Sequence, residues 1–217
     1  MESASQIHNW QRKENDMKTF WEIRESTTGK SLTIFDIDET LFHTTAKISV
    51  VDQAGNVIRK LDNQQFNTYK LGAGESFDFG EFKNAELFNK KSQPIRPMLA
   101  KLKAIIRNSK GGRIIMLTAR EDFDDKKTFL ATFKRYGINM NSVYVHRAGN
   151  LKTGTTAEKK TRIIAKYLDT GVYGRVRLYD DAKSNLDGFL NMRPGYDGID
   201  FEAYLVKQGG KIQRYDT

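Results

Sequence analysis

Short apolar runs alternating with helix-like patterns constrain the fold of this chain more than any other feature. Residues 32–35, 114–117 and 176–179 are apolar runs of the length and composition of buried strands. Other stretches carry apolar side chains at the 3.6-residue period of a helix, namely residues 97–106, 129–136 and 156–168. Strands and helices in this alternation predict an α/β fold whose central sheet is mostly parallel.

Three further segments flank or interrupt this alternation. Residues 1–28 carry apolar and aromatic side chains among charged ones and predict a helical segment. Residues from about 43 to 92 predict two short strands around an Ala-Gly-Asn turn and then a glycine-rich aromatic stretch, so we expect a small β-rich insertion. Residues 202–215 predict a hairpin at a sheet edge, turning at residues 208–210. The 217 residues suit one domain with these additions.

Composition excludes some classes of protein and favours one kind of partner. The chain has no cysteine, which excludes disulfide bonds and thiolate metal sites. It shows neither the apolar run of a signal peptide nor one long enough to span a bilayer, so we expect a cytoplasmic protein without a membrane partner. A net charge of +9 favours a polyanionic partner such as nucleic acid or a nucleotide. Because basic and acidic residues are interspersed, a surface that only confers solubility explains the charge as well.

Polar side chains follow each of the three apolar runs directly. Asp36 follows the first run, Thr118 the second, and Asp180 with Asp181 the third. The carboxyl ends of parallel strands lie along one edge of a sheet, where ligands bind. Asp38 lies two residues after Asp36, so in extended chain both side chains point toward that edge. Clustered carboxylates repel one another unless a cation or a shared proton relieves the repulsion. An all-oxygen cluster without cysteine or a nearby histidine favours Mg²⁺, with a phosphate ester as substrate.

Four motifs resemble those of a known superfamily. The segment DIDET, residues 36–40, resembles the DxDx[TV] signature of the haloacid dehalogenase (HAD) superfamily. Thr118 in MLTAR, a lysine in TAEKKTRII and the segment YDDAKSN follow in the order of that superfamily's second, third and fourth motifs. The spacing from residue 94 onward also resembles the phosphatase domains of polynucleotide kinase-phosphatases and related phage-encoded phosphatases. The resemblance implies a Rossmann-like, doubly wound sheet with the insertion as a small cap.

The resemblance also implies roles for these residues. Asp36 would attack phosphorus and form an aspartyl-phosphate, and Asp38 would protonate the leaving alcohol and then activate water. Thr118 would hydrogen-bond the phosphoryl oxygens, and a lysine would balance their charge together with Mg²⁺. Arg120 would reach the substrate phosphate or the carboxylates, or would point to solvent. Lys160 shares the inward stripe of its helix, which favours it over Lys159 as the phosphate-binding lysine.

The same resemblance implies a metal shell made of aspartates. Asp36 and the backbone carbonyl of Asp38 would bind Mg²⁺ on one side, and Asp181 on the other. Asp180 would be either a second ligand or a partner of the lysine. Asn185 stands where the signature often has a carboxylate, which leaves the composition of the shell open.

These residue types also have interpretations that involve no chemistry. Aspartate and threonine at strand ends often cap a following helix, and most lysines are solvated. Aromatic side chains of the insertion would either stack on bases or pack the insertion against the body, and these are Phe77, Phe79, Phe82 and Phe88. The complete set of polar residues at strand ends favours a site over separate caps.

We therefore expect a Mg²⁺-dependent HAD-type phosphoric monoester hydrolase that acts on a nucleotide or on the terminal phosphate of a nucleic acid. A phosphatase of sugar phosphates and a phosphotransferase with the same motifs are alternatives. A nucleic-acid-binding module without chemistry is a third, but such a module would be expected to lose Asp36 or Asp38, and both are present. Dehalogenase activity is disfavoured because displacement of halide gives Asp38 no role.

Overall fold

A six-stranded sheet forms the centre of the computed structural model, which describes residues 29–109 and 111–216. Its strands are β1 (Lys30–Phe35), β7 (Arg113–Thr118), β8 (Tyr144–Arg147), β9 (Tyr173–Asp180), β10 (Asp200–Lys207) and β11 (Lys211–Tyr215). They lie in the order β11-β10-β9-β1-β7-β8, and each neighbouring pair is parallel except β10 and β11. The prediction of an α/β fold with a mostly parallel sheet is confirmed. The predicted helical segment over residues 1–28 lies outside the described residues.

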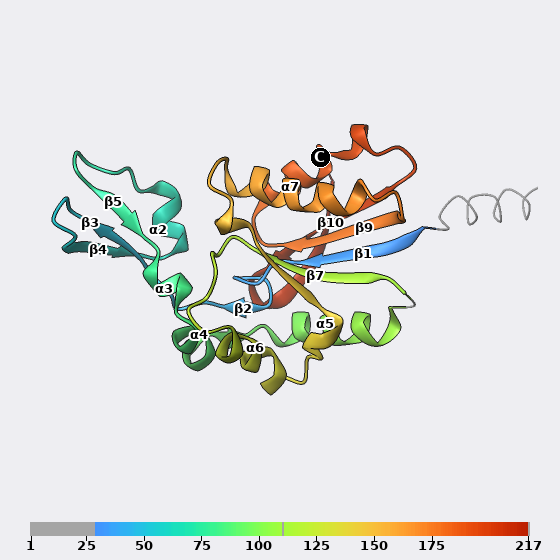
Figure 1. Cartoon of the computed structure of the whole chain (residues 1–217), viewed down its shortest axis with the longest axis horizontal. Helices are drawn as coiled ribbons and strands as arrows, with labels where there is room; N and C mark the ends of the chain where they lie inside the picture. Colours follow the sequence, from blue (N-terminus) through green and yellow to red (C-terminus); the bar gives the residue numbers. More distant parts are fainter. Residues whose placement is uncertain (1–28, 110, 217) are drawn as a thin grey trace, which may run out of the picture.

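Helices cover both faces of this sheet (Figure 1). One face carries α7 (Thr156–Leu168) and α8 (Lys183–Leu190), and the other carries α4 (Ala85–Lys91), α5 (Arg96–Asn108) and α6 (Lys126–Arg135). Local signals in the sequence set their ends. Thr155 and Glu158 form a capping box at the start of α7, and Gly137 adopts a φ of 72° just after α6. None of the helices in residues 29–109 and 111–216 is both long and apolar enough to cross a membrane.

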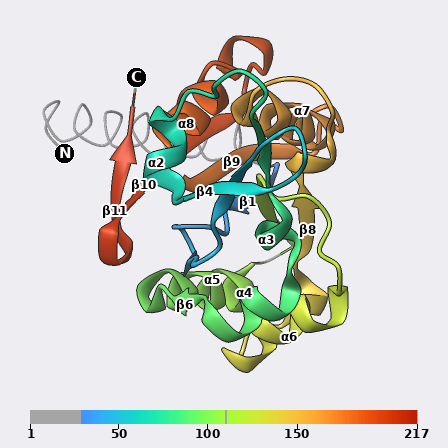
Figure 2. The same cartoon turned by 90° about the vertical axis from the view of Figure 1, so that its left-hand side faces the viewer.

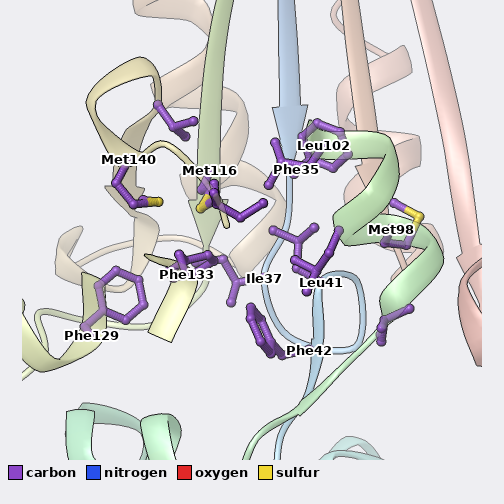
Figure 3. Close-up of a cluster of buried hydrophobic side chains, with 14 of the residues drawn as sticks. Phe35, Ile37, Leu41, Phe42, Met98, Leu102, Met116, Phe129, Phe133 and Met140 are labelled. Carbon is purple, nitrogen blue, oxygen red and sulfur yellow. The ribbon is translucent and has the colours of Figure 1, made fainter. Parts of the chain in front are cut away.

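Side chains that alternate along β1 build two cores, one on each face of the sheet. Leu32 and Ile34 pack with the α7 and α8 face, whereas Phe35 packs with the opposite face. Figure 3 shows the second of these cores, in which Phe35 and Met116 lie near side chains of the surrounding helices and loops. Burial of strands on both faces is expected of a parallel sheet. It holds the carboxyl ends of β1, β7 and β9 in a fixed arrangement.

The predicted insertion is anchored by a short ribbon in which β2 (Phe42–His43) pairs with β6 (Gln93–Pro94). Beyond it lies an antiparallel sheet of β3 (Ile48–Val51), β4 (Val57–Leu61) and β5 (Ser76–Asp78), with the helices α2 (Asn63–Thr68) and α3 (Gly80–Lys83). Figure 1 shows this unit beyond one end of the central sheet, and Figure 2 shows it from that end, in front of the sheet. The two strands around the Ala-Gly-Asn turn are present as predicted. The last part of the segment, α4, instead packs against α6 of the body through Phe88 and Phe129.

Short connections complete the chain. They include the 3₁₀ turns η1 (Met140–Ser142), η2 (Ala148–Asn150), η3 (Arg193–Gly195) and η4 (Gln208–Gly210). The last of these joins β10 to β11, with Gly209 and Gly210 at φ values of 73° and 82°. Side chains other than glycine adopt such values at a cost, which explains the Gly-Gly pair. The predicted hairpin is therefore present, and β11 is an edge strand of the sheet.

Candidate active site

The polar residues predicted to meet do so at the carboxyl edge of the sheet. Asp36 follows β1, Thr118 ends β7, and Asp180 ends β9 with Asp181 next to it. A cavity of about 400 Å³ opens at this edge, and its lining includes Asp36 and Asp181. The cavity extends to the insertion, so the aspartates at the strand ends and side chains of the insertion line the same cavity.

Lys160 links two carboxylates that come from different strands. Its Nζ donates to Asp36 Oδ1 at 2.6 Å and to Asp180 Oδ2 at 2.7 Å. All three side chains are at least nine-tenths buried. Lys160 projects from the first turns of α7, inward as the helical stripe predicted. Lys159 lies beside it on the rim of the cavity, half-buried, and has no ion pair within the described residues.

Burial and charge act in opposite directions on these groups. Burial alone would lower the pKa of Lys160, but the carboxylates of Asp180 and Asp36 outweigh it and raise that pKa. The direction of this shift keeps Lys160 a cation at neutral pH. Burial raises the pKa of Asp36 well above its usual value, Lys160 opposes this, and the other aspartates reinforce it. Partial desolvation and repulsion from Asp180 raise the pKa of Asp181 to about 7.

Asp180 is held on both of its carboxylate oxygens. Oδ2 accepts the hydrogen bond from Lys160, while Oδ1 accepts from Asn185 Nδ2 at 2.9 Å and from the backbone N–H of Ala182 at 3.0 Å. Asn185, which replaces a carboxylate in the resembled signature, thus positions Asp180. Asp181 is the freer of the two neighbours, with one long contact of 3.4 Å from Thr40 Oγ1. Of the two roles that the sequence left open for Asp180, partnership with Lys160 is the one this geometry displays.

Asp36, Asp180 and Asp181 together could hold a metal ion. Each offers a carboxylate oxygen, and the three oxygens lie within 4.8 Å of one another. Four aspartates gather here when Asp38 is included, against the two cations Lys160 and Arg120. With all four carboxylates ionised, two negative charges would be left without a partner. Oxygen donors and a deficit of two positive charges fit a hard divalent cation.

The second aspartate of the DIDET segment is bound by an arginine fork. Arg120 Nη2 lies 2.7 Å from Asp38 Oδ1, and Arg120 Nε lies 2.9 Å from Asp38 Oδ2. Thr118 Oγ1 lies 3.3 Å from the same Oδ2 and accepts the backbone N–H of Arg120 at 3.2 Å. Thr118 is completely buried behind Asp38 and is not among the residues that line the cavity. A two-pronged hydrogen bond of this kind fixes the orientation of a carboxylate more firmly than a lysine would.

Arg120 also connects this carboxylate to the insertion. Its Nη1 donates to the backbone carbonyl of Phe82 at 2.7 Å, and its Nη2 donates to Thr44 Oγ1 at 2.8 Å. The guanidinium carbon lies 4.7 Å from the centre of the Phe82 ring and 5.0 Å from that of Phe88. Arg120 is only 3% exposed. Of the three placements open from sequence, the structure has Arg120 on a carboxylate.

A strained turn sets the position of Asp38. Glu39 has a φ of 55°, the only positive φ of a non-glycine residue within the described ranges. Such a conformation costs on the order of 1 kcal/mol and persists where surrounding contacts impose it. The Glu39 carboxylate lies 2.7 Å from His43 Nδ1 and accepts the backbone N–H of Thr44 at 3.0 Å. The pattern DxDx[TV] did not reveal these contacts, because they depend on residues after the motif.

Comparison with known proteins adds no name to this site. No protein-family model matches the chain, and a search of curated proteins likewise found no match. The chemistry proposed below therefore rests on the residues and their geometry.

Proposed function

We propose that the chain is a HAD-type phosphatase that hydrolyses a phosphate monoester through an aspartyl-phosphate on Asp36. The observation that carries the proposal is the placement of Asp36 and Asp38 in one cavity with Lys160 against the first of them. Helices on both faces of a sheet whose order runs outward from β1 in both directions support a doubly wound, Rossmann-like fold. In such folds ligands bind at this edge.

The first chemical step uses the free oxygen of Asp36. Oδ1 accepts the hydrogen bond from Lys160, and Oδ2 accepts none from the described residues. In the ionised form, which Lys160 favours against the effect of burial, Oδ2 attacks phosphorus. The bond from phosphorus to the alcohol oxygen breaks, and the alcohol oxygen takes a proton from Asp38. Lys160 stays protonated throughout and offsets the negative charge that gathers on the phosphoryl oxygens.

The second step returns the enzyme to its starting state. Asp38, now ionised, takes a proton from a water molecule, which attacks phosphorus and releases phosphate from Asp36. Arg120 and Thr118 keep the Asp38 carboxylate in place while its proton leaves and returns.

Mg²⁺ is the cofactor that we propose for the aspartate cluster. Asp36 and Asp181 would hold it, with the Asp38 carbonyl as a further oxygen and Asp180 kept beside it by Lys160 and Asn185. A bound Mg²⁺ would neutralise phosphoryl oxygens and orient them for in-line displacement.

The substrate that we propose is a nucleotide or the terminal phosphate of a nucleic acid. The net charge of +9 supports a polyanionic substrate, since it raises the local concentration of phosphates. A cavity that reaches the insertion leaves room for an alcohol larger than a simple sugar. A sugar-phosphate phosphatase is the alternative within the same chemistry.

Phosphate release from a panel of esters tests the proposal. The panel contains p-nitrophenyl phosphate, sugar phosphates, nucleotides and oligonucleotides phosphorylated at the 3′ or 5′ end, each with and without Mg²⁺. We expect Mg²⁺-dependent turnover that Asp36→Asn abolishes, because the amide is not a nucleophile. Asp187→Asn is the matched control, since its carboxylate lies outside the cavity and contacts Tyr215.

Other outcomes would identify the other functions. A folded protein that releases no phosphate from any ester would overturn the phosphatase proposal. A phosphoryl group that stays on the protein and is passed to an added alcohol instead of water would indicate a phosphotransferase. Turnover of sugar phosphates with no activity on nucleotides or oligonucleotides would overturn the choice of substrate alone.

A further inference from the structure

We propose that the exposed ring of Phe79, supported by the neighbouring rings of Phe66 and Phe82, is a stacking platform for the unpaired base of the substrate. This inference rests on the proposed function, and it narrows the substrate to phosphate esters of nucleosides, whether free nucleotides or the ends of single strands. We call these three residues the aromatic platform.

One cavity joins the aromatic platform to the aspartates. Its lining has two unlike parts, a charged floor with Asp36 and Lys160, and an apolar wall on the insertion. The insertion contributes Lys83, which is paired with Glu121, and four apolar side chains that form the wall, namely Ile48, Phe66, Phe79 and Phe82. A volume of about 400 Å³ is in the range of pockets that take a small organic ligand. A phosphate on the floor would therefore place the rest of its ester against the wall.

Phe79 has an uncovered ring, unlike the other aromatic candidates of the sequence. It is 39% exposed, whereas Phe88 is 2% exposed and belongs to the core of the body. Phe66, Phe77 and Phe82 meet the Phe79 ring at 82°, 55° and 71°, with centroids 5.7 to 6.4 Å away. No ring within the described residues lies parallel to it. Its exposure and this absence of a parallel ring leave Phe79 available for stacking by a planar group.

Arg120 fixes the position of the aromatic platform relative to the catalytic carboxylates. Phe82 accepts a hydrogen bond from Arg120 through its carbonyl, and its ring lies against the same guanidinium, which also binds Asp38. Phe66 and Phe79 in turn pack against the edges of neighbouring rings. The distance from the platform to the carboxyl that protonates the leaving alcohol is thus set by the fold. A base on the platform would help position its ester.

The chemistry of the wall selects a planar ring over a polyol. The four wall side chains carry no hydrogen-bonding group, so sugar hydroxyls turned toward them would lose their water without replacement. Bases tolerate such a wall because each has an aromatic face, and stacking depends little on base identity. Lys159, also on the rim, is a cation without an ion pair in the part of the chain described. It suits a second phosphate of a strand.

Kinetics on matched substrates test the platform. The substrates are adenosine 3′- and 5′-monophosphate, a trinucleotide with a terminal phosphate, and ribose 5-phosphate, all with the full chain and Mg²⁺. We expect Phe79→Leu to lower kcat/KM for the nucleotides about tenfold, with ribose 5-phosphate changed less than about twofold. Phe79→Tyr, which keeps a ring, should retain most of the nucleotide activity. Leu71→Ala is the control, because Leu71 is a 43% exposed apolar residue of the insertion outside the cavity.

A binding measurement separates this inference from the proposed function. Calorimetry with adenosine monophosphate compares Asp36→Asn with the double variant Asp36→Asn/Phe79→Leu, and needs no turnover. We expect the second substitution to weaken binding about tenfold. Equal effects of Phe79→Leu on nucleotides and ribose 5-phosphate, or unchanged binding in the double variant, would overturn the platform. Absence of phosphatase activity with this loss of binding would overturn the proposed function but leave the platform standing.

Discussion

Strand β9 carries ion pairs near both of its ends, and the two pairs differ mainly in their contact with water. Near its start, Arg175 Nε lies 2.9 Å from Asp200 Oδ2, and both side chains are 38% exposed. At its end, Asp180 Oδ2 lies 2.7 Å from Lys160 Nζ, and the side chains are 0% and 3% exposed. The two ion pairs have similar distances but differ in their free energy of desolvation, because the charges of the inner pair are buried away from water and those of the outer pair are not.

The difference shows what each end of the strand does for the protein. The outer pair joins neighbouring positions of β9 and β10 and adds little to a sheet already held by its backbone. Desolvation of the inner pair opposes folding, and well-packed apolar side chains in its place would often be at least as stable. The apolar cores on both faces of the sheet offset that cost. Buried charges of this kind indicate a functional site.

Removing the cation at the inner end should have the largest effect. Lys160→Met leaves Asp36 and Asp180 buried without their shared partner. We expect the free energy of unfolding to fall by about 3–5 kcal/mol in urea denaturation. Lys159→Met, one residue earlier and without an ion pair in the described residues, should change it by less than about 0.5 kcal/mol. Equal losses of unfolding free energy in Lys160→Met and Lys159→Met would mean that Lys160 does not stabilise the buried carboxylates of Asp36 and Asp180.

Removing the arginine that binds Asp38 should cost somewhat less. Arg120→Met deletes the fork on Asp38 and the bonds to Phe82 and Thr44, and we expect a loss of about 3 kcal/mol. Arg120→Lys restores the charge without the fork, so about half of the loss should return. Activity should fall more for alkyl esters than for p-nitrophenyl phosphate, whose leaving group needs no proton from Asp38. A uniform fall across esters would contradict the positioning of Asp38.

Adding Mg²⁺ should stabilise the inner end selectively. At a free concentration one hundred times the dissociation constant, binding adds about 2.7 kcal/mol to the free energy of unfolding. Asp181→Asn should remove most of this gain, and Asp200→Asn at the outer end should leave it intact. Mg²⁺ that stabilised neither variant nor the natural protein would argue against the metal site.

The pH dependence of that gain follows from the raised pKa of Asp181. With a folded pKa of about 7 against an ordinary value of 3.8, the metal-free protein loses stability as the pH rises from the ordinary value to the folded one, because the unfolded carboxyl ionises before the folded one beside Asp180 does. Mg²⁺ binds the ionised form, so its stabilising effect should be larger at pH 8 than at pH 6. Thermal melting at the two pH values measures this, and Asp181→Asn should flatten the difference.

Local rules explain why most of the framework was predictable from sequence. Apolar periodicity predicted a helix from about residue 156 to Gly171, and α7 spans Thr156–Leu168. Apolar runs predicted the central strands, and the geometry of parallel sheets then predicted that Asp36 and Asp180 would meet. The helix and strand predictions depend on residues close in sequence, and the meeting of the two aspartates depends on one topological rule. One amino-acid sequence is therefore enough to make these predictions.

Contacts between distant residues explain what the sequence left open. The partners of Arg120 lie 38, 76 and 82 residues away along the chain, and no local pattern encodes them. Phe88 follows the aromatic stretch of the insertion, yet it packs into the body. Phe66 lines the cavity, although no pattern in the surrounding sequence predicted that position. In each case tertiary packing decided the orientation of a side chain whose type alone allowed several.

The smallest effect is expected at the outer end of β9. Arg175→Ala removes the contacts to Asp200 and Glu202, and we expect the free energy of unfolding to fall by about 1 kcal/mol or less. Because water reaches these charges, 1 M salt should remove most of that difference, whereas the loss in Lys160→Met should persist at the same ionic strength. A salt-insensitive loss of several kcal/mol in Arg175→Ala would show that exposure does not separate the two ends. The comparison of the two ends would then give no support to a functional role for the buried charges.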